Sequence, residues 1–317
     1  MSWDHLQLNP QIISAVQRAQ LKSVREVLCV SGPDLQKMTG LSRSDVRELL
    51  HAAATASRTH QPVTALQLQR GECHRLESGL RLGTGCPVLD QLLRGGLPVG
   101  GVTELSGESG AGKTQLGLQL CLSVQYPVEH RGLSSGALYI CTEDPFPIKR
   151  LQQLISEQSV LRSDVPRSLI SGLQFSDHIY IEHTADLDSL QVCLLRRAPI
   201  LLARGLVRLI VIDSVAALFS QEFTTPILCI NQVTDVFNQS ANSLSSSSSS
   251  VCPALGLAWA NQVMVRLMMR RLQGKVFLGD QSSALRRLEV VFAPHLARNS
   301  RDIGVWREGL RAVLDPD

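Results

Sequence analysis

The chain has 317 residues, enough for about two domains and for a core that needs no disulfides or metal ions. Hydrophobic residues make up 44% and charged residues 19%, which excludes global disorder. The net charge of +3 is too small to indicate a nucleic-acid or membrane binder by itself. No apolar run reaches the ~18 residues that cross a bilayer, and residues 1–5 lack the features of a secretion signal. The eight cysteines include no CxxC pair, so we expect reduced, buried thiols of an intracellular protein.

Residues 1–57 are predicted to form a small all-helical domain. Apolar residues recur at helical spacing in three segments. Two capping-box pairs, Ser23 with Glu26 and Ser42 with Asp45, mark helix starts, and Gly40 fits a turn between two short helices. Such a unit is typical of helix-hairpin-helix modules that lie on the DNA backbone. A small bundle that docks onto another protein fits the pattern at least as well.

Residues 58–79 are polar and weakly patterned, and we predict a linker there. Within it, the stretch from Val63 to Leu68 is β-prone. An isolated strand is not stable alone, so we expect this segment to be an assembly strand that joins the edge of a sheet, in this chain or in another.

From about residue 80 to residue 317, predicted strands alternate with predicted helices. Strands are expected at 102–105, 137–141, 179–181, 209–212 and 227–230, and helices at 115–124, 148–155 and 187–195. The strands at 209–212 and 227–230 have no polar face, which is typical of a parallel sheet covered on both sides. Late strands are expected at 263–267 and 288–292, and a Ser-rich loop over about 238–251 is predicted to be disordered.

The segment 107–114 matches the phosphate-binding pattern G-x-x-x-x-G-K-[ST] in full, between a predicted strand and a predicted helix. Its residues are Gly107, Glu108, Ser109, Gly110, Ala111, Gly112, Lys113 and Thr114. In this context backbone N–H groups and the positive end of the helix dipole hold phosphate oxygens. We expect Lys113 to bridge the β- and γ-phosphates and Thr114 to bind Mg²⁺. The alternative, a glycine-rich turn without a ligand, is disfavoured by the strand-to-helix context.

Three further polar residues follow predicted strands of the same sheet. Asp213 closes the strand 209–212, which puts its carboxylate at the edge where the phosphate loop lies, in a position to hold the metal through water. Glu143 follows the strand 137–141 and could activate an attacking water, although an acidic turn fits equally well. Gln232 follows the strand 227–230 and could sense a γ-phosphate, although taken alone it is better explained as an ordinary polar strand end.

Together these motifs resemble those of the RecA-like recombinases. The stretch from Leu89 to Leu93 with Gly95 and Gly96, ahead of the first core strand, fits the same family. The N-terminal helical unit resembles that of the eukaryotic branch, and the stretches 32–35, 64–68, 86–90, 139–144 and 229–234 are similar to one eukaryotic recombinase paralogue. The resemblance is close for residues 1 to about 267 and weak beyond them.

The resemblance implies an α/β fold, with a RecA-like P-loop ATPase core and a mostly parallel sheet after the helical domain. It implies ATP and Mg²⁺ as cofactors, weak DNA-dependent ATPase activity and work in homologous-recombination repair of DNA double-strand breaks. Location in the nucleus follows from the family alone, with a cytoplasmic pool as an alternative. Carried over by position, the resemblance assigns phosphate binding to Lys113, metal binding to Thr114 and Asp213, water activation to Glu143, γ-phosphate sensing to Gln232 and a place near the adenine to Arg150.

The family also implies a heterodimer with another recombinase paralogue, with DNA bound through that complex and no membrane contact. Residues 63–65 lie where the family has an aromatic-centred self-assembly motif, and the aromatic is absent here. No Lys or Arg occurs from Thr234 to Val265, the place of the family's second DNA loop. Phosphate neutralisation supplies most non-specific DNA affinity, and Phe237 alone cannot replace it. The nearby basic residues are expected at a solvated edge: Arg266, Arg270, Arg271, Arg286 and Arg287.

The chain departs from the family between Asp213 and Pro226. Two parallel strands need a crossover of a dozen or more residues, usually with a helix. Only residues 214–225 lie between the two expected strands, and Val215 to Phe219 are expected to continue the apolar element. We expect that an internal segment was lost near 224–225, through splicing or an incomplete gene model, with a genuine shortening as the alternative. In that case the strand at 227 is mispaired, the connection that leads to it is strained, or the layer of structure around it is incomplete.

These observations leave three candidate functions. The first is an ATP-binding mediator of recombination that acts with a partner paralogue. The second is an inactive or dominant-negative isoform that retains nucleotide or partner binding. The third is a DNA strand-exchange ATPase in its own right, which the uncharged second loop and the absent assembly aromatic disfavour.

Overall fold

The computed structural model describes residues 8–21, 23–28, 30–57, 64–70, 80–214, 225–235, 251–253 and 262–313. The chain divides into two compact units, Met1–Arg75 and Leu76–Asp317. Within the described residues, no helix is long and apolar enough to span a membrane.

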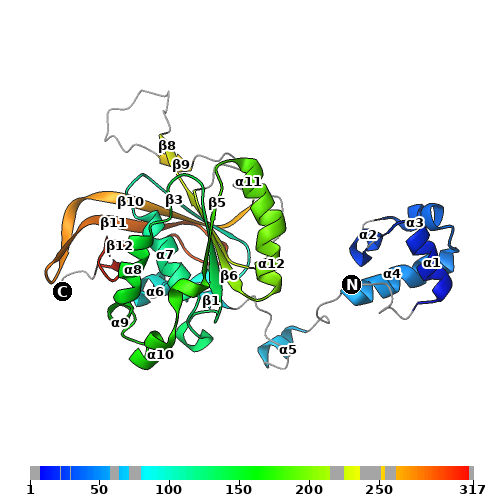
Figure 1. Ribbon diagram of the computed structural model, residues 1–317, viewed down its shortest axis with the longest axis horizontal. Helices are drawn as coiled ribbons and strands as arrows, with labels where there is room; N and C mark the ends of the chain where they lie inside the picture. Colours follow the sequence, from blue (N-terminus) through cyan, green and yellow to red (C-terminus); the bar gives the residue numbers. More distant parts are fainter. Residues whose placement is uncertain are drawn as a thin grey trace. The chain divides into compact units, whose positions relative to one another are not determined.

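The first unit is helical, as predicted, and is drawn in blue in Figure 1. It contains α1 (Pro10–Arg18), α2 (Val24–Leu28), α3 (Gly32–Thr39) and α4 (Arg43–Ser57). The Glu26 N–H donates to the Ser23 hydroxyl, and the Ser42 hydroxyl donates to Asp45, so both predicted caps are confirmed. Gly40 ends α3 with a φ of +69°, a conformation that favours glycine. The apolar faces meet in one core: Leu8, Ile12, Val16, Leu21, Val24, Val27, Leu35, Val46, Leu49 and Ala53.

The predicted assembly strand is wrong where the structure describes it, because residues Ala65–Gln69 form the short helix α5. The Gln67 N–H donates to the Thr64 hydroxyl, and the Thr64 N–H donates to the Gln67 side-chain oxygen at 2.8 Å. This reciprocal cap, together with Ala, Leu and Gln residues of high helix propensity, favours a helix over an unpaired strand. Residues 58–63 and 71–79 of the predicted linker lie outside the described residues.

The second unit is built on a nine-stranded sheet of order β13-β12-β11-β10-β3-β7-β6-β4-β5. The strands from β10 through β5 in this order are parallel, and β10 to β13 form antiparallel pairs. Their bounds are β3 Val102–Gly107, β4 Gly136–Cys141, β5 Ile179–His183, β6 Val207–Asp213, β7 Ile227–Asn231, β10 Val263–Leu278, β11 Gln281–Phe292, β12 Ser300–Val305 and β13 Leu310–Ala312. The predicted α/β class with a mostly parallel sheet is confirmed. Two small ribbons pair β1 (Arg81–Leu82) with β2 (Leu97–Pro98), and β8 (Val233–Asp235) with β9 (Val251–Pro253).

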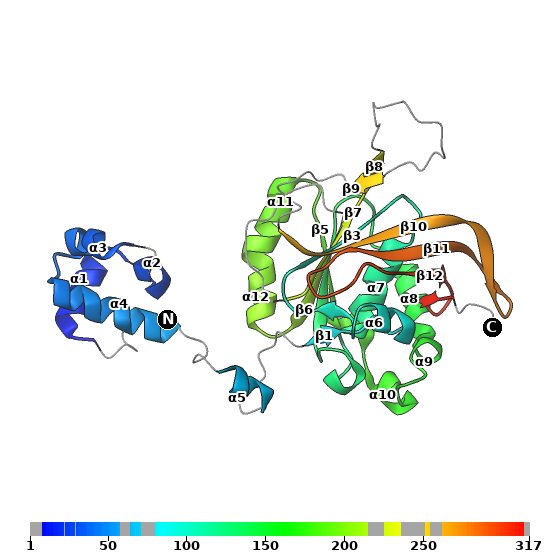
Figure 2. The same cartoon turned by 180° about the vertical axis from the view of Figure 1, so that it is seen from behind.

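Helices cover both faces of the sheet, as the two views in Figures 1 and 2 show. One face carries α6 (Pro87–Leu92), α7 (Lys113–Ser123), α8 (Ile148–Ser156), α9 (Gln158–Leu161) and α10 (Arg167–Gly172). The other carries α11 (Leu187–Val192), a π-helical turn (Cys193–Arg197) and α12 (Ala198–Ala203). Short 3-10 turns occupy Val128–His130 and Phe175–His178. All residues of α7 from Leu116 to Ser123 are buried, as its all-round apolar sequence predicts.

The strand at residue 227 is paired correctly, so the expectation of mispairing is wrong. β7 lies between β3 and β6 and is parallel to both, with Ile227 opposite Val102 on one side and Ile210 on the other. Every residue of β7 is buried. Successive side chains of β7 point alternately into the hydrophobic cores on the two faces of the sheet. A slip by one residue would move each side chain to the opposite core, so burial fixes the register. The other two expectations, a strained connection and an incomplete layer, concern residues 215–224, which lie outside the described residues. Most of the predicted Ser-rich loop lies outside them as well.

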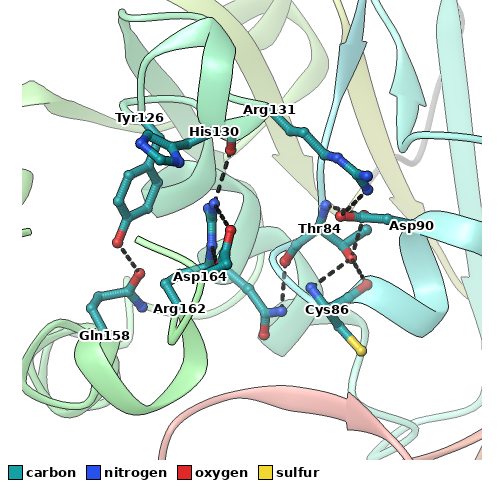
Figure 3. A network of polar contacts seen from close by, with 10 residues as sticks. Thr84, Cys86, Asp90, Tyr126, His130, Arg131, Gln158, Arg162 and Asp164 are labelled. Atoms are coloured by element: carbon teal, nitrogen blue, oxygen red, sulfur yellow. Dashed lines mark hydrogen bonds and ion pairs between the residues drawn. The ribbon is translucent and has the colours of Figure 1, made fainter. Parts of the chain in front are cut away.

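A polar network around the buried Arg162 joins the segment that follows α7 to α9, as Figure 3 shows. The Arg162 guanidinium donates to both oxygens of Asp164 at 2.9 Å and to the His130 carbonyl at 2.9 Å. It lies 4.4 Å from the centre of the Tyr126 ring, and the Tyr126 hydroxyl donates to Gln158. A cavity of about 180 Å³ borders this network. Because its buried charged groups already have protein partners, we assign the network to stability.

Gln119 in α7 joins the helix to both ends of the unit. Its amide nitrogen donates to the Thr84 carbonyl at 2.7 Å and the Leu310 carbonyl at 3.2 Å, and its oxygen accepts the Leu310 N–H at 2.7 Å. The side chain is buried, so water cannot replace these bonds. It therefore holds β13 against the central helix.

We expect Gln119→Ala to lower the free energy of unfolding by about 2–3 kcal/mol, because it leaves buried backbone groups without partners. Urea denaturation measures this loss. The control is Gln152→Ala on the exposed side of α8, which should change stability by less than about 0.5 kcal/mol. Equal losses in the two variants would contradict the role of Gln119.

Candidate functional site

The phosphate loop joins β3 to α7, and its backbone requires glycine at several positions. Gly110 and Gly112 have φ values of +73° and +105°, which side-chain-bearing residues rarely adopt. A Cβ at Gly107 would lie 2.2 Å from the Met269 carbonyl oxygen on β10. The loop therefore passes close to the neighbouring strand and reaches the start of α7, where free backbone N–H groups and the helix dipole favour an anion.

A cavity of about 400 Å³ lies at this loop, within the size range of ligand pockets. It brings together five of the eight predicted loop residues with the predicted residues of three strand ends and of α8, whereas Gly107, Glu108 and Ala111 do not line it. Its lining is Ser109, Gly110, Gly112, Lys113, Thr114, Gln115, Glu143, Asp144, Arg150, Asp213, Ser214, Gln232, Arg286 and Val305. The sequence did not predict Gln115, Asp144, Ser214, Arg286 or Val305 as site residues.

Lys113 points back to the start of the loop. Its Nζ donates to the carbonyl oxygens of Gly107 at 2.7 Å and Glu108 at 2.9 Å. Burial lowers the pKa of Lys113, and the negative charges of Asp213, Glu108 and Glu143 oppose that shift. Within the described residues, this half-buried ammonium donates to carbonyl oxygens. It is suited to exchange them for phosphate oxygens, which carry full charges.

Asp213 at the end of β6 accepts two hydrogen bonds on one oxygen. The Thr114 hydroxyl donates to Oδ2 at 2.7 Å, and the Tyr139 hydroxyl on β4 donates to the same atom at 2.6 Å. Burial and the charge of Asp213 raise the pKa of Tyr139 well above its usual value, so the phenol keeps its proton and remains a donor. The sequence does not single out Tyr139 as a site residue, because its strand is apolar throughout and only the fold brings its hydroxyl to Asp213.

The oxygen atoms of Thr114 and Asp213 fit a magnesium ion. Within the described residues, no group of three or more His, Cys, Asp or Glu could hold a metal on its own. Magnesium does not need one, because it is usually bound by one or two carboxylates together with substrate phosphates and water. The pair therefore fits Mg²⁺ that arrives with a nucleotide.

Glu143 is held in the cavity by two donors. The Ser214 hydroxyl donates to Oε1 at 2.6 Å, and the Gln232 amide donates to Oε2 at 3.1 Å. The three side chains come from the ends of β4, β6 and β7, which are neighbours in the sheet. Gln232 is thus a direct partner of the carboxylate predicted to activate water.

The buried carboxylate of Glu104 anchors the end of β7, the strand that precedes Gln232. Asn231, its neighbour, donates to Glu104 Oε1 at 2.7 Å, and Arg266 donates to Glu104 Oε2 at 2.5 Å. Glu104 is fully buried, so loss of either donor would weaken the position of the β7 end. Arg266 therefore does not belong to a solvated edge, contrary to the sequence-based expectation.

Arg150 lines the cavity from α8. It donates to Gln115 Oε1 at 2.6 Å and to the carbonyls of Trp306 at 2.6 Å and Arg307 at 3.0 Å. Burial lowers its pKa, and Glu308 opposes the shift. The guanidinium thus ties α7 and α8 to the turn after β12 at the rim of the cavity, and its place near an adenine stays a prediction.

Comparison with known proteins matches both units. The family description "XRCC3/RpoA-like, helix-hairpin-helix domain" matches residues 3–57, and "Rad51" matches residues 75–226. The "DNA repair protein XRCC3" of Mus musculus is 48% identical over 343 residues, covering 99% of this chain and 98% of the mouse protein. The chain belongs to the XRCC3 branch of the RecA-like recombinases.

Other relatives of the XRCC3 branch agree. The Bos taurus protein of the same name is 48% identical over 99% of this chain and 98% of its own length. An Arabidopsis thaliana "DNA repair protein XRCC3 homolog" is 35% identical over 75% of this chain and 95% of its own length. The mouse alignment spans 343 residues against 317 in this chain, a difference of 26, so at least that many aligned positions have no counterpart here.

We expect Tyr139→Phe to destabilise the chain by about 1 kcal/mol, because Asp213 loses one of its two donors inside a partly buried site. Urea denaturation measures the change. Tyr180→Phe on β5 is the control, since its hydroxyl has no hydrogen-bond partner among the described residues. The role of Tyr139 as a donor is contradicted if both variants unfold at the same urea concentration.

Proposed function

We propose that this chain binds ATP with Mg²⁺ and assists recombinational repair of DNA breaks as a mediator, in complex with another recombinase paralogue. The observation that carries the proposal is the cavity at the phosphate loop, where Lys113, Thr114, Glu143 and Asp213 converge. The names of the relatives, which are DNA repair proteins, support the biological setting. A place in the nucleus, where such breaks occur, is part of the same proposal.

Each side chain has a defined task in the proposed site. Lys113 exchanges its carbonyl partners for the β- and γ-phosphates, and the loop N–H groups hold the remaining phosphate oxygens. Thr114 and Asp213 would hold Mg²⁺, which supplies charge neutralisation along the triphosphate when bound. Glu143 accepts a proton from the attacking water, while Ser214 and Gln232 orient its carboxylate.

The proposed ATPase activity is weak and linked to conformation. Weak activity is what the resemblance to the recombinases implies. Glu143 is exposed and is held by the Ser214 hydroxyl and the Gln232 amide. Gln232 links that carboxylate to β7, which continues into the part of the chain where the family has its second DNA loop. Occupation of the phosphate site is therefore suited to signal to a bound partner or DNA.

A second candidate, an inactive or dominant-negative isoform, is favoured by the short connection between β6 and β7. Only residues 214–226 join these two parallel strands, and the mouse alignment is longer than this chain. Loss of a segment near 224–225 accounts for both facts. The genomic sequence around codons 224 and 225 tests whether that segment is encoded.

We expect Lys113→Ala to weaken Mg²⁺-ATP binding at least about tenfold, because it removes the cation nearest the phosphate site. Isothermal titration of the full chain with a non-hydrolysable ATP analogue measures the affinity. Lys149→Ala, an exposed lysine on α8, is the matched control and should bind like the wild type. Unchanged affinity in Lys113→Ala would refute the proposed site.

The choice between mediator and inactive isoform is tested by co-expression with a partner recombinase paralogue. A mediator forms a soluble complex and restores resistance to DNA damage in cells that lack the relative. An inactive isoform is pulled down with the partner but gives no rescue. Filaments of this chain alone on single-stranded DNA would instead support the strand-exchange ATPase, which the sequence from Thr234 to Val265, without Lys or Arg, disfavours.

A further inference from the structure

Arg286 reaches the phosphate-loop cavity from β11, on the other side of β3 from Asp213. One of its terminal nitrogens, Nη2, donates to the Gly110 carbonyl at 3.3 Å. A Cβ at Gly112 would lie 3.6 Å from the Arg286 Cδ. The side chain therefore lies against the loop at two of its glycines.

The charge of Arg286 has no carboxylate partner among the described residues. Its Nη1 donates to Ser283 Oγ at 3.1 Å and to the Ala284 carbonyl at 2.8 Å, and its Nε is buried without a hydrogen-bond acceptor in the described chain. The residue opposite it on β10 is Arg271. The Glu108 carboxylate nearby accepts the Arg271 backbone N–H at 2.7 Å, and neither guanidinium forms an ion pair with it. Burial and the positive charge of Arg271 lower the pKa of Arg286.

The same hairpin contains a second arginine pair that is neutralised. Arg270 lies opposite Arg287, on the other face of the ribbon. Arg270 pairs with Glu289 at 3.3 Å, and Arg287 pairs with Asp302 at 2.6 Å. Like charges at paired positions destabilise a sheet. Carboxylates thus offset the repulsion between Arg270 and Arg287. The repulsion between Arg271 and Arg286, on the face toward the phosphate loop, is left for a bound anion to offset.

We propose that Arg286 is a second cationic ligand for the phosphates of the nucleotide, acting at Gly110 while Lys113 acts at the start of the loop. This inference rests on the proposed ATP binding and deepens it. A planar guanidinium suits phosphate oxygens because it donates hydrogen bonds in pairs. A polyphosphate reaches both cations more readily than a single phosphate does, so Arg286 favours nucleoside di- and triphosphates over monophosphates.

The test is the affinity of the full chain for ATP, ADP and AMP with Mg²⁺, measured by titration calorimetry. We expect Arg286→Ala to weaken ATP and ADP binding by about tenfold to a hundredfold and AMP binding much less. Arg287→Ala removes the neighbouring arginine, which has its own carboxylate partner, and should leave all three affinities unchanged. Arg286→Lys keeps the charge and should recover part of the loss.

The outcomes separate the two proposals. If the wild type binds ATP and Arg286→Ala changes its affinity by less than about twofold, or reduces ATP and AMP binding equally, the role of Arg286 is overturned and the proposed ATP site stands. If the wild type binds no ATP, both are overturned. A thermal melt without nucleotide shows whether Arg286→Ala folds. If it does not, the same nucleotide affinities are measured for Arg286→Gln, which retains donors for Ser283 and Ala284, with Arg287→Gln as its control.

Discussion

Parallel pairing of β3, β7, β6 and β4 is the constraint on which the site depends. Because these strands run in the same direction, the residues that follow them meet at one edge of the sheet. Strand direction alone accounts for the convergence of segments that are more than a hundred residues apart in the sequence: the phosphate loop, Glu143, Asp213 and Gln232. Burial of every β7 residue keeps the register that this convergence requires.

A central buried helix links this edge to the rest of the unit. α7 begins at Lys113 in the phosphate loop, and its buried turns carry Gln119, which bonds the segment near Thr84 and the strand β13. Farther along, Tyr126 packs against Arg162 and bonds Gln158. The buried helix, together with the segment that follows it, thus supports the loop glycines, whose backbone conformations other residues could not adopt without strain.

The parts of the site that are local in sequence, or follow from strand direction, could be predicted. The phosphate loop is a contiguous motif, and Asp213, Glu143 and Gln232 follow apolar strands. Arg286 could not be found in this way, because its place depends on the pairing of β10 with β11, and only the last part of β11 has an apolar pattern. The segment after Thr64 forms a helix although it contains β-prone residues, because Thr64 and Gln67 cap it locally.

The place of β7 in the middle of the sheet has a consequence for chain length. Both β6 and β3 flank this strand, so its position is set by side-chain burial on two faces and by hydrogen bonds on two edges. Variants that differ only within residues 215–224 would then keep β7 between β3 and β6, together with the cavity at the phosphate loop. Ligand binding at that cavity would therefore not report on what the connecting residues do.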